Sequence, residues 1–222
     1  MNFDAVLFDC DGVLVDSEPL TNQVLRDMLE ERGWSMDLQQ CMDIFVGNTV
    51  ADFRERIELE TGLPLTPEWM AQFRQRRNQR LQDDIQAIAN IHGALATLQQ
   101  RTAGRMACAS GADRPKVELM LRKVGLLPFF EGRIFSGQDL ARSKPHPDVY
   151  LAAAAHVGVD PRRCAVVEDT LTGLAAGVAA GATVFAYAPQ GGGAHLLQAG
   201  AAQVFSDMAQ LPGLLAAHRP TH

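Results

Sequence analysis

Several features that would assign the chain to a particular class of protein are missing from its 222 residues. It has no excess of positive charge, because 26 acidic residues outnumber 20 basic ones and leave a formal net charge of −6. Such a charge repels the phosphate backbone of nucleic acids unless a local basic groove overcomes the repulsion, so we expect no nucleic-acid partner. Internal repeats and low-complexity tracts are also absent, which excludes a repeat protein.

Cysteine is scarce and the sequence offers it no obvious pairing. The four residues, Cys10, Cys41, Cys108 and Cys164, are scattered without a Cys-x-x-Cys pair, and three of them lie in apolar runs typical of buried strands. We therefore expect free thiols in a reducing compartment. Residues 1–9 contain no basic segment followed by an apolar one, so we expect no secretory signal and a cytoplasmic protein.

Long apolar runs are missing too. Residues 170–206 contain no Asp, Glu, Lys or Arg, but several glycines and one proline divide this stretch into pieces too short to span a membrane. We expect a buried helix, a turn and a strand there, and no membrane partner. Hydrophobic residues make up 47% of the chain and charged residues 21%, the ordinary balance of a globular protein, and the length allows one or two domains.

What the sequence does contain is an alternation of short apolar, β-rich runs with helical patterns. Glycines bound most of these runs, and parallel βαβ units are the usual result of such an alternation. The predicted fold class is α/β, a doubly wound parallel sheet with helices on both faces. The six predicted strands are residues 5–8, 105–109, 133–135, 164–167, 183–187 and 203–205.

One stretch interrupts the alternation. Residues 16–85 contain no convincing strand but hold helical runs rich in Arg, Gln and Glu, at 22–32, 51–61 and 68–84. Because this stretch follows the first strand and the βαβ order then resumes, we interpret it as an inserted helical domain. The predicted organisation is a core domain of residues 1–15 and 86–222 and a helical domain of residues 16–85.

The end of the first predicted strand carries two acids. In open parallel sheets ligands gather outside the carboxyl ends of the strands, and Asp9-Cys10-Asp11-Gly12 follows residue 8 directly. Carboxylates two residues apart point to the same side of the chain, and Gly12 permits a close turn. Such a pair can hold a hard cation, attack phosphorus or transfer protons, although the same pattern also occurs in ordinary turns and calcium loops.

Three more strand ends carry polar residues. Ser110 and Gly111 precede a helix, where a hydroxyl and backbone N–H groups suit a phosphate oxygen, although an ordinary turn and cap would look the same. Lys144 lies between a turn and a proline-led helix and can neutralise phosphate charge, whereas most single lysines are merely solvated. Glu168 and Asp169 end an apolar strand, where adjacent acids are costly unless a cation meets them.

Taken together, the four sites resemble the haloacid dehalogenase superfamily. The resemblance rests on Asp9-Cys10-Asp11-Gly12-Val13, Ala109-Ser110-Gly111, Ser143-Lys144-Pro145 and Glu168-Asp169, in that order and each behind a strand. It covers nearly the whole chain. The helical stretch is similar to the small helical cap of the subgroup that contains phosphoglycolate phosphatases, sugar phosphatases and beta-phosphoglucomutases.

The resemblance implies a role for each motif. Asp9 is the expected nucleophile that forms an aspartyl-phosphate, and Asp11 the acid and base that protonates the leaving alcohol and then activates water. Ser110, Gly111 and Lys144 are the expected ligands of the phosphoryl oxygens.

The resemblance also implies a magnesium ion. Its expected ligands are the side chains of Asp9 and Asp169 and the backbone carbonyl of Asp11. Glu168 is expected to bind the ion directly or from just outside its ligand shell. Phosphoryl transfer needs mainly positioning and charge neutralisation, which Mg²⁺, a lysine and backbone N–H groups supply together.

Two places in the predicted helical domain are candidates for contact with the substrate. Gly47, Asn48 and Thr49 form a turn between helices, where related enzymes place a loop that reaches the substrate. Arg77 belongs to an arginine-rich run that is either a solvated helix face or a surface that reaches an anionic substrate.

We therefore expect a magnesium-dependent phosphatase that acts on a small phosphorylated metabolite, such as a sugar phosphate or a phosphoglycolate-like ester, as a monomer or weak dimer. A sugar phosphomutase is the first alternative. Where a beta-phosphoglucomutase-like protein carries a histidine and an arginine in its cap, we align Thr21 and Val50, which weakens that reading. The second alternative is a phosphate-binding protein without turnover, but no motif residue is missing.

Overall fold

The computed structural model describes residues 2–218 and divides into two compact units. One unit, here called the core unit, joins Met1–Val15 to Ala87–His222. The other, the helical unit, is Asp16–Gln86. Residue 1 and residues 219–222, which belong to the predicted core domain, lie outside the described residues.

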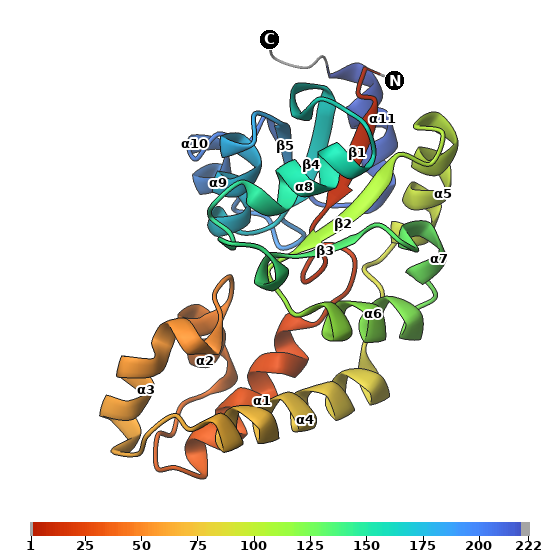
Figure 1. Ribbon diagram of the computed structural model, residues 1–222. Coiled ribbons are helices and arrows are strands. Elements are labelled where there is room, and N and C mark those ends of the chain that lie inside the picture. The colour runs from red at the N-terminus through yellow and green to blue at the C-terminus, as the bar shows by residue number, and fades with distance from the viewer. Residues whose placement is uncertain (1, 219–222) are drawn as a thin grey trace. The chain divides into compact units, whose positions relative to one another are not determined.

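The core unit is built on a six-stranded, wholly parallel sheet with the strand order β3-β2-β1-β4-β5-β6 (Figure 1). The predicted α/β fold class is confirmed, and each predicted strand lies within one residue of its observed position at either end. The strands are β1 (Ala5–Phe8), β2 (Met106–Ser110), β3 (Ile134–Ser136), β4 (Cys164–Glu168), β5 (Thr183–Tyr187) and β6 (Gln203–Phe205).

Helices cover both faces of this sheet, as its apolar strands require. Alternate strand residues such as Leu7 and Val166 pack with Tyr150 and Leu174 on one face, whereas Phe8 packs against Phe130 on the other. Figure 1 shows α8 and α9 against the first face and α5, α7 and α11 against the second. The core-unit helices are α5 (Ile91–Arg101), α6 (Arg114–Lys123), α7 (Leu127–Phe130), α8 (Asp148–His156), α9 (Leu171–Ala179), α10 (Ala194–Gln198) and α11 (Leu211–Ala217).

Two of these helices begin where polar side chains cap them. The side chain of Asp113 accepts a hydrogen bond from the Lys116 amide at the start of α6. The hydroxyl of Thr170 accepts one from the Gly173 amide at the start of α9. Each cap satisfies a backbone donor that the first turn of a helix leaves without a partner. The helices α6 and α9 begin only a few residues after the carboxyl ends of β2 and β4, respectively.

The helical unit has its own apolar core. Its helices are α1 (Glu18–Glu30), α2 (Leu38–Phe45), α3 (Arg54–Thr61) and α4 (Pro67–Asp84). The buried cluster includes Leu25, Met28, Phe45, Ile57 and Phe73. Residues 38–45 were not predicted as a helix. Their signal is short but present, because Asp37 and Gln40 form a reciprocal capping box ahead of an apolar face.

No helix within residues 2–218 combines the length and the apolar character that crossing a bilayer requires.

Candidate active site

Polar side chains gather where β1, β2 and β4 end. Asp9 follows β1 directly, Ser110 is the last residue of β2, and Glu168 is the last residue of β4. The central strand β1 pairs in parallel with both neighbours, and the Asp9 amide donates to the Val167 carbonyl at 3.0 Å. Parallel pairing thus brings Asp9 to the same edge of the sheet as residues about 100 or more positions later in the chain.

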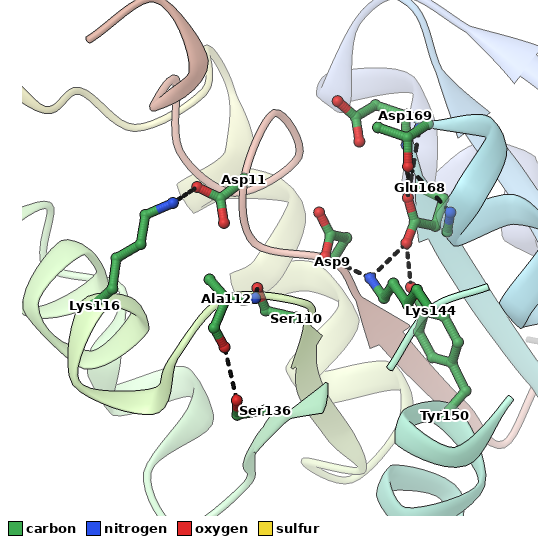
Figure 2. Close-up of polar contacts among 12 residues, drawn as sticks. Asp9, Asp11, Ser110, Ala112, Lys116, Ser136, Lys144, Tyr150, Glu168 and Asp169 are labelled. Carbon is green, nitrogen blue, oxygen red and sulfur yellow. Dashed lines mark hydrogen bonds and ion pairs between the residues drawn. The ribbon is translucent and has the colours of Figure 1, made fainter. Parts of the chain in front are cut away.

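Lys144 joins two of these acids. Its Nζ lies 2.6 Å from Asp9 Oδ1 and 2.6 Å from Glu168 Oε1 (Figure 2). All three side chains are buried, with exposed fractions of 8% for Lys144, 10% for Asp9 and 1% for Glu168. A buried charge is tolerated only when a partner compensates it, and here one cation is shared by two carboxylates.

The surroundings of this cluster raise the pKa of both Asp9 and Lys144, with opposite consequences for their charge. Burial raises the pKa of Asp9 to about 7, and the Glu168 and Asp11 carboxylates add to the rise although Lys144 opposes it. Burial opposes the charge of Lys144, but the carboxylates of Asp9 and Glu168 raise its pKa well above the ordinary value. Lys144 therefore keeps its positive charge. The raised pKa of Asp9 shows that its surroundings disfavour its negative charge, so a second cation beside it would be stabilising.

Asp169 completes a group of three carboxylates. Oxygen atoms of Asp9, Glu168 and Asp169 all lie within 4.8 Å of one another. Gly12, with a φ of +75°, makes this approach possible, because a Cβ at that position would lie 2.0 Å from Asp169 Oδ2. Hard divalent cations such as Mg²⁺ prefer carboxylate and carbonyl oxygen ligands, so the donor set fits such an ion.

Glu168 is the most fully bonded member of the group. Its Oε1 accepts from Lys144 Nζ and from the Tyr150 hydroxyl, both at 2.6 Å. Its Oε2 faces the amides of Asp169 and Thr170 and the Thr170 hydroxyl, at 3.2 to 3.5 Å. Glu168 thereby ties the end of β4 to the first turn of α9.

The remaining predicted core residues lie at the same sheet edge but make other contacts. Asp11 Oδ1 accepts from Lys116 Nζ at 2.6 Å, so its carboxylate is not among the three that cluster. The predicted contribution of Asp11 to the metal site was its backbone carbonyl, which this ion pair leaves unaffected. Ser110 is 1% exposed and its hydroxyl accepts from the Ala112 amide at 3.0 Å, while Gly111 is half-buried ahead of α6.

Two residues of this site, Lys116 and Tyr150, were not predicted from the sequence. Lys116 is 6% exposed although a lysine in the first turn of a helix is normally solvated. Its position next to the apolar residues Val117, Met120 and Leu121 is the only sequence signal of burial. Tyr150 is fully buried among alanines of α8. The chain has only two tyrosines, and the position of this one inside a short apolar segment indicates burial.

The candidate residues of the helical unit lie in the loop after α2 and on α4. Gly47 has a φ of +82°, and Asn48 donates to the Val46 carbonyl at 3.4 Å. Thr49 caps the short 3-10 helix Val50–Phe53 together with Asp52. Arg77 does not belong to a solvated face, since it is 8% exposed on the buried side of α4 and its guanidinium lies over the Phe73 ring. The nearby Arg74, Arg76 and Arg80 are exposed.

The chain is similar to several known proteins. The model of the haloacid dehalogenase-like hydrolase family matches residues 3–181. The 6-phosphogluconate phosphatase of Escherichia coli (strain K12) is 31% identical over 182 residues, which cover 82% of this chain and 81% of that protein.

Two solved structures are similar over nearly their full length. A conserved haloacid dehalogenase-like protein of unknown function from Agrobacterium tumefaciens has a TM-score of 0.83 at 34% identity, covering 97% of this chain and 98% of that one. A hydrolase of the same family from Deinococcus radiodurans, solved with bound phosphate and sodium, has a TM-score of 0.79 at 36% identity, covering 97% of this chain and 96% of that one.

Proposed function

The chain belongs to the haloacid dehalogenase-like hydrolases, and from this premise we propose that it is a magnesium-dependent phosphatase of small phosphate monoesters. The observation that carries the proposal is the contact of Lys144 Nζ with Asp9 Oδ1 at 2.6 Å beside the carboxylates of Glu168 and Asp169. A nucleophilic carboxylate can attack a phosphate dianion only if cations offset both charges, and this cluster provides one cation and a place for another.

The reaction proceeds in two steps on this chain's own groups. A carboxylate oxygen of Asp9 bonds to phosphorus as the ester P–O bond breaks, and Asp11 gives a proton to the leaving alkoxide. A water molecule then bonds to the phosphorus of the aspartyl-phosphate and gives a proton to Asp11. The acyl P–O bond breaks, so that inorganic phosphate leaves and the Asp9 carboxylate is restored.

Lys144, the Ser110 hydroxyl and the Gly111 amide bind the phosphoryl oxygens in this scheme. Among residues 2–218, Lys144 Nζ has two hydrogen-bond acceptors, Asp9 and Glu168. An ammonium group has three donors, so its third N–H can point to the phosphoryl group.

The site fits Mg²⁺ as its metal. Asp9, Asp169 and the Asp11 carbonyl would hold the ion, and Glu168 would lie beside it. When bound, Mg²⁺ neutralises charge on the phosphoryl group and on Asp9. Lys144 is one cation beside three mutually repelling carboxylates, so a second cation would be stabilised there, which supports this assignment.

The proposed substrates are sugar phosphates or similarly small phosphate esters in the cytoplasm. The support is the 31% identity to a protein named 6-phosphogluconate phosphatase, over 81% of its length. We further propose that Gly47, Asn48, Thr49 and Arg77 of the helical unit contact the non-reacting part of the substrate.

The test is a screen of phosphate monoesters with Mg²⁺ that measures the release of inorganic phosphate. We expect turnover of one or more sugar phosphates, its loss in excess chelator and its recovery when Mg²⁺ is restored. Undiminished turnover in excess chelator would contradict the metal assignment, and no release from any ester would contradict the phosphatase.

A second experiment separates hydrolysis from phosphate transfer. Phosphorus NMR of hexose phosphates, with a trace of bisphosphate as primer, follows both products. Rapid exchange between the 1- and 6-phosphates with little free phosphate would replace the phosphatase by a phosphomutase.

A further inference from the structure

Tyr150 is a buried polar group that the proposed reaction does not use. It lies on α8 with no exposed surface, and its hydroxyl is 2.6 Å from Glu168 Oε1. Lys144 Nζ lies over its ring, 4.9 Å from the ring centroid. Tyr150 therefore contacts both Glu168 and Lys144. Its helix, α8, packs against β1, β2 and β3.

We propose that Tyr150 is a positioning residue that holds Lys144 at Asp9 through Glu168, and that Glu168 anchors this lysine instead of binding the metal ion. The proposal rests on the proposed function and assigns separate tasks to the acids of the cluster. Asp9 and Asp169 face the metal ion, whereas Glu168 faces the protein.

The bonding of Glu168 supports this division. A carboxylate has about four lone-pair positions, and five donors already surround this one. Lys144 and Tyr150 share Oε1 at 2.6 Å each. The Asp169 amide and the amide and hydroxyl of Thr170 surround Oε2. A metal ion could bind Glu168 only by displacing one of these donors.

The packing around Glu168 also leaves little room for rearrangement. A Cβ on Gly173 would lie 1.8 Å from Glu168 Oε1 and 2.1 Å from Oε2, so only glycine allows the carboxylate to sit against α9. The Thr170 hydroxyl that faces Oε2 also caps α9 by accepting from the Gly173 amide at 3.1 Å. Glu168 is thus held by α8 on one side and by α9 on the other.

The geometry at Lys144 shows what the anchoring achieves. Its ammonium is held on one side by Glu168 Oε1 and faces the Tyr150 ring on another. An aromatic face attracts a cation without using one of its hydrogen-bond donors. The remaining N–H groups are thereby directed to Asp9 and to the position that the phosphoryl group takes in the proposed function. Without the Tyr150 hydroxyl, Glu168 loses its hydrogen bond to α8 and keeps its contacts with Lys144 and with the start of α9.

The experiment compares Tyr150→Phe, which keeps the ring and removes the hydroxyl, with Thr102→Val as a matched control. Thr102 is also fully buried in the core unit, and its hydroxyl donates to the Leu98 carbonyl at 2.8 Å, within α5 and its C-cap. Thermal unfolding establishes that both variants are folded. Calorimetry then measures the affinity for Mg²⁺ alone and the affinity for inorganic phosphate at saturating Mg²⁺.

We expect Tyr150→Phe to weaken phosphate binding about tenfold, the low end of the cost of losing a hydrogen bond to a charged group, because the lost bond acts on phosphate only through Glu168 and Lys144. The affinity for Mg²⁺ should stay within about twofold of the wild type. Thr102→Val should change neither affinity. Wild-type phosphate affinity in Tyr150→Phe would overturn the positioning role. A tenfold loss of Mg²⁺ affinity, with or without weaker phosphate binding, would overturn the division of tasks by showing that Glu168 binds the ion.

A second measurement does not depend on phosphate or turnover. The chain has three lysines, Lys116, Lys123 and Lys144, so the ammonium signals of ¹⁵N-lysine-labelled protein are few enough to assign by single substitutions. We expect the Lys144 signal of Tyr150→Phe to shift or broaden while those of Lys116 and Lys123 stay in place. An unchanged Lys144 signal would overturn the proposal even if the protein proved to be a phosphatase. Absence of phosphatase activity in the wild type would contradict the proposed function and leave this comparison valid.

Discussion

The candidate residues of the core unit and those of the helical unit differ in how their polar contacts are formed. In the core unit, Lys144 contacts an acid 135 residues away in the sequence, and Lys116 one that is 105 residues away. In the helical unit, Asn48 bonds to a carbonyl two residues away, and Thr49 to an acid three residues away. The core contacts exist only when the whole sheet is formed, whereas the loop contacts are local. Groups that must be placed accurately for chemistry belong to the first kind, and a loop of the second kind can change without disturbing the fold.

If the two units differ in this way, the largest loss of activity should come from replacing an acid of the core unit. Asp11→Asn should lower kcat by about 10²–10⁴-fold, the usual contribution of general acid–base catalysis. The loss should be smallest for nitrophenyl phosphate, whose leaving group needs no proton. Steady-state kinetics on this ester and on a sugar phosphate measures both. Equal losses on the two esters would mean that Asp11 does not protonate the leaving group.

Replacing a glycine of the core unit beside the metal site should have a smaller effect, on Mg²⁺ affinity. Gly12→Ala would push a methyl group into Asp169, and we expect Mg²⁺ affinity to fall roughly 10–100-fold, as for other changes beside metal ligands. Gly104→Ala is the matched control, because Gly104 has a φ of +77° but nothing within 4 Å of its Cβ position. Both variants should lose about 1–2 kcal/mol of stability from left-handed strain. If Gly104→Ala also lost Mg²⁺ affinity, strain and not the contact with Asp169 would be responsible.

The pH dependence of Mg²⁺ binding follows from the raised pKa of Asp9, about 7. Below that pH the group is mostly protonated and must release its proton to bind the ion. Affinity should therefore fall as the pH drops through 7, approaching about a tenfold loss per pH unit, and level off above 7. Calorimetry at pH 6, 7 and 8 measures this slope. Asp9→Asn should abolish it, and a slope that persisted in that variant would assign the titration to another group.

The smallest effect is expected from the helical unit. Asn48→Ala should change the ratio of kcat/KM for a sugar phosphate to that for nitrophenyl phosphate by roughly three- to tenfold, because it removes a contact with the non-reacting part of the substrate. Gln39→Ala, an exposed change on α2, is the control. Equal loss of turnover on large and small esters would give Asn48 a structural role and remove the functional contrast between the two units.

The sequence predicted the parts of the molecule that depend on local pattern. Six strands and the helices after Gly111, Pro147 and Thr170 were recognisable from apolar runs, caps and glycines. Their alternation was sufficient to predict that Asp9 and Glu168 lie at the carboxyl edge of the sheet, whereas the role of Lys144, which lies well beyond the end of β3, depended on the resemblance.

The parts that could not be predicted depend on contacts distant in sequence or on weak local signals. The contact of Tyr150 with Glu168 requires α8 to pack on the sheet. Lys116 looks like any lysine until β1 places Asp11 beside it. Arg77 repeats the four-residue spacing of Trp69, Phe73 and Leu81 along the buried side of α4, but its charge predicts a solvated face. The helix α2 was missed although Asp37 and Gln40 form a capping box at its start.

Covalent trapping shows directly whether Asp9 carries the phosphoryl group. The enzyme is quenched during turnover of a sugar phosphate and reduced with borohydride, which converts an aspartyl-phosphate to homoserine, and the peptide that contains residue 9 is analysed by mass spectrometry. We predict reduction at Asp9 in the wild type, dependent on substrate and Mg²⁺, with more of it in Asp11→Asn and none in Asp9→Asn. Steady turnover with no reduction at Asp9 in the wild type or in Asp11→Asn would contradict the account, because water would then attack the substrate directly.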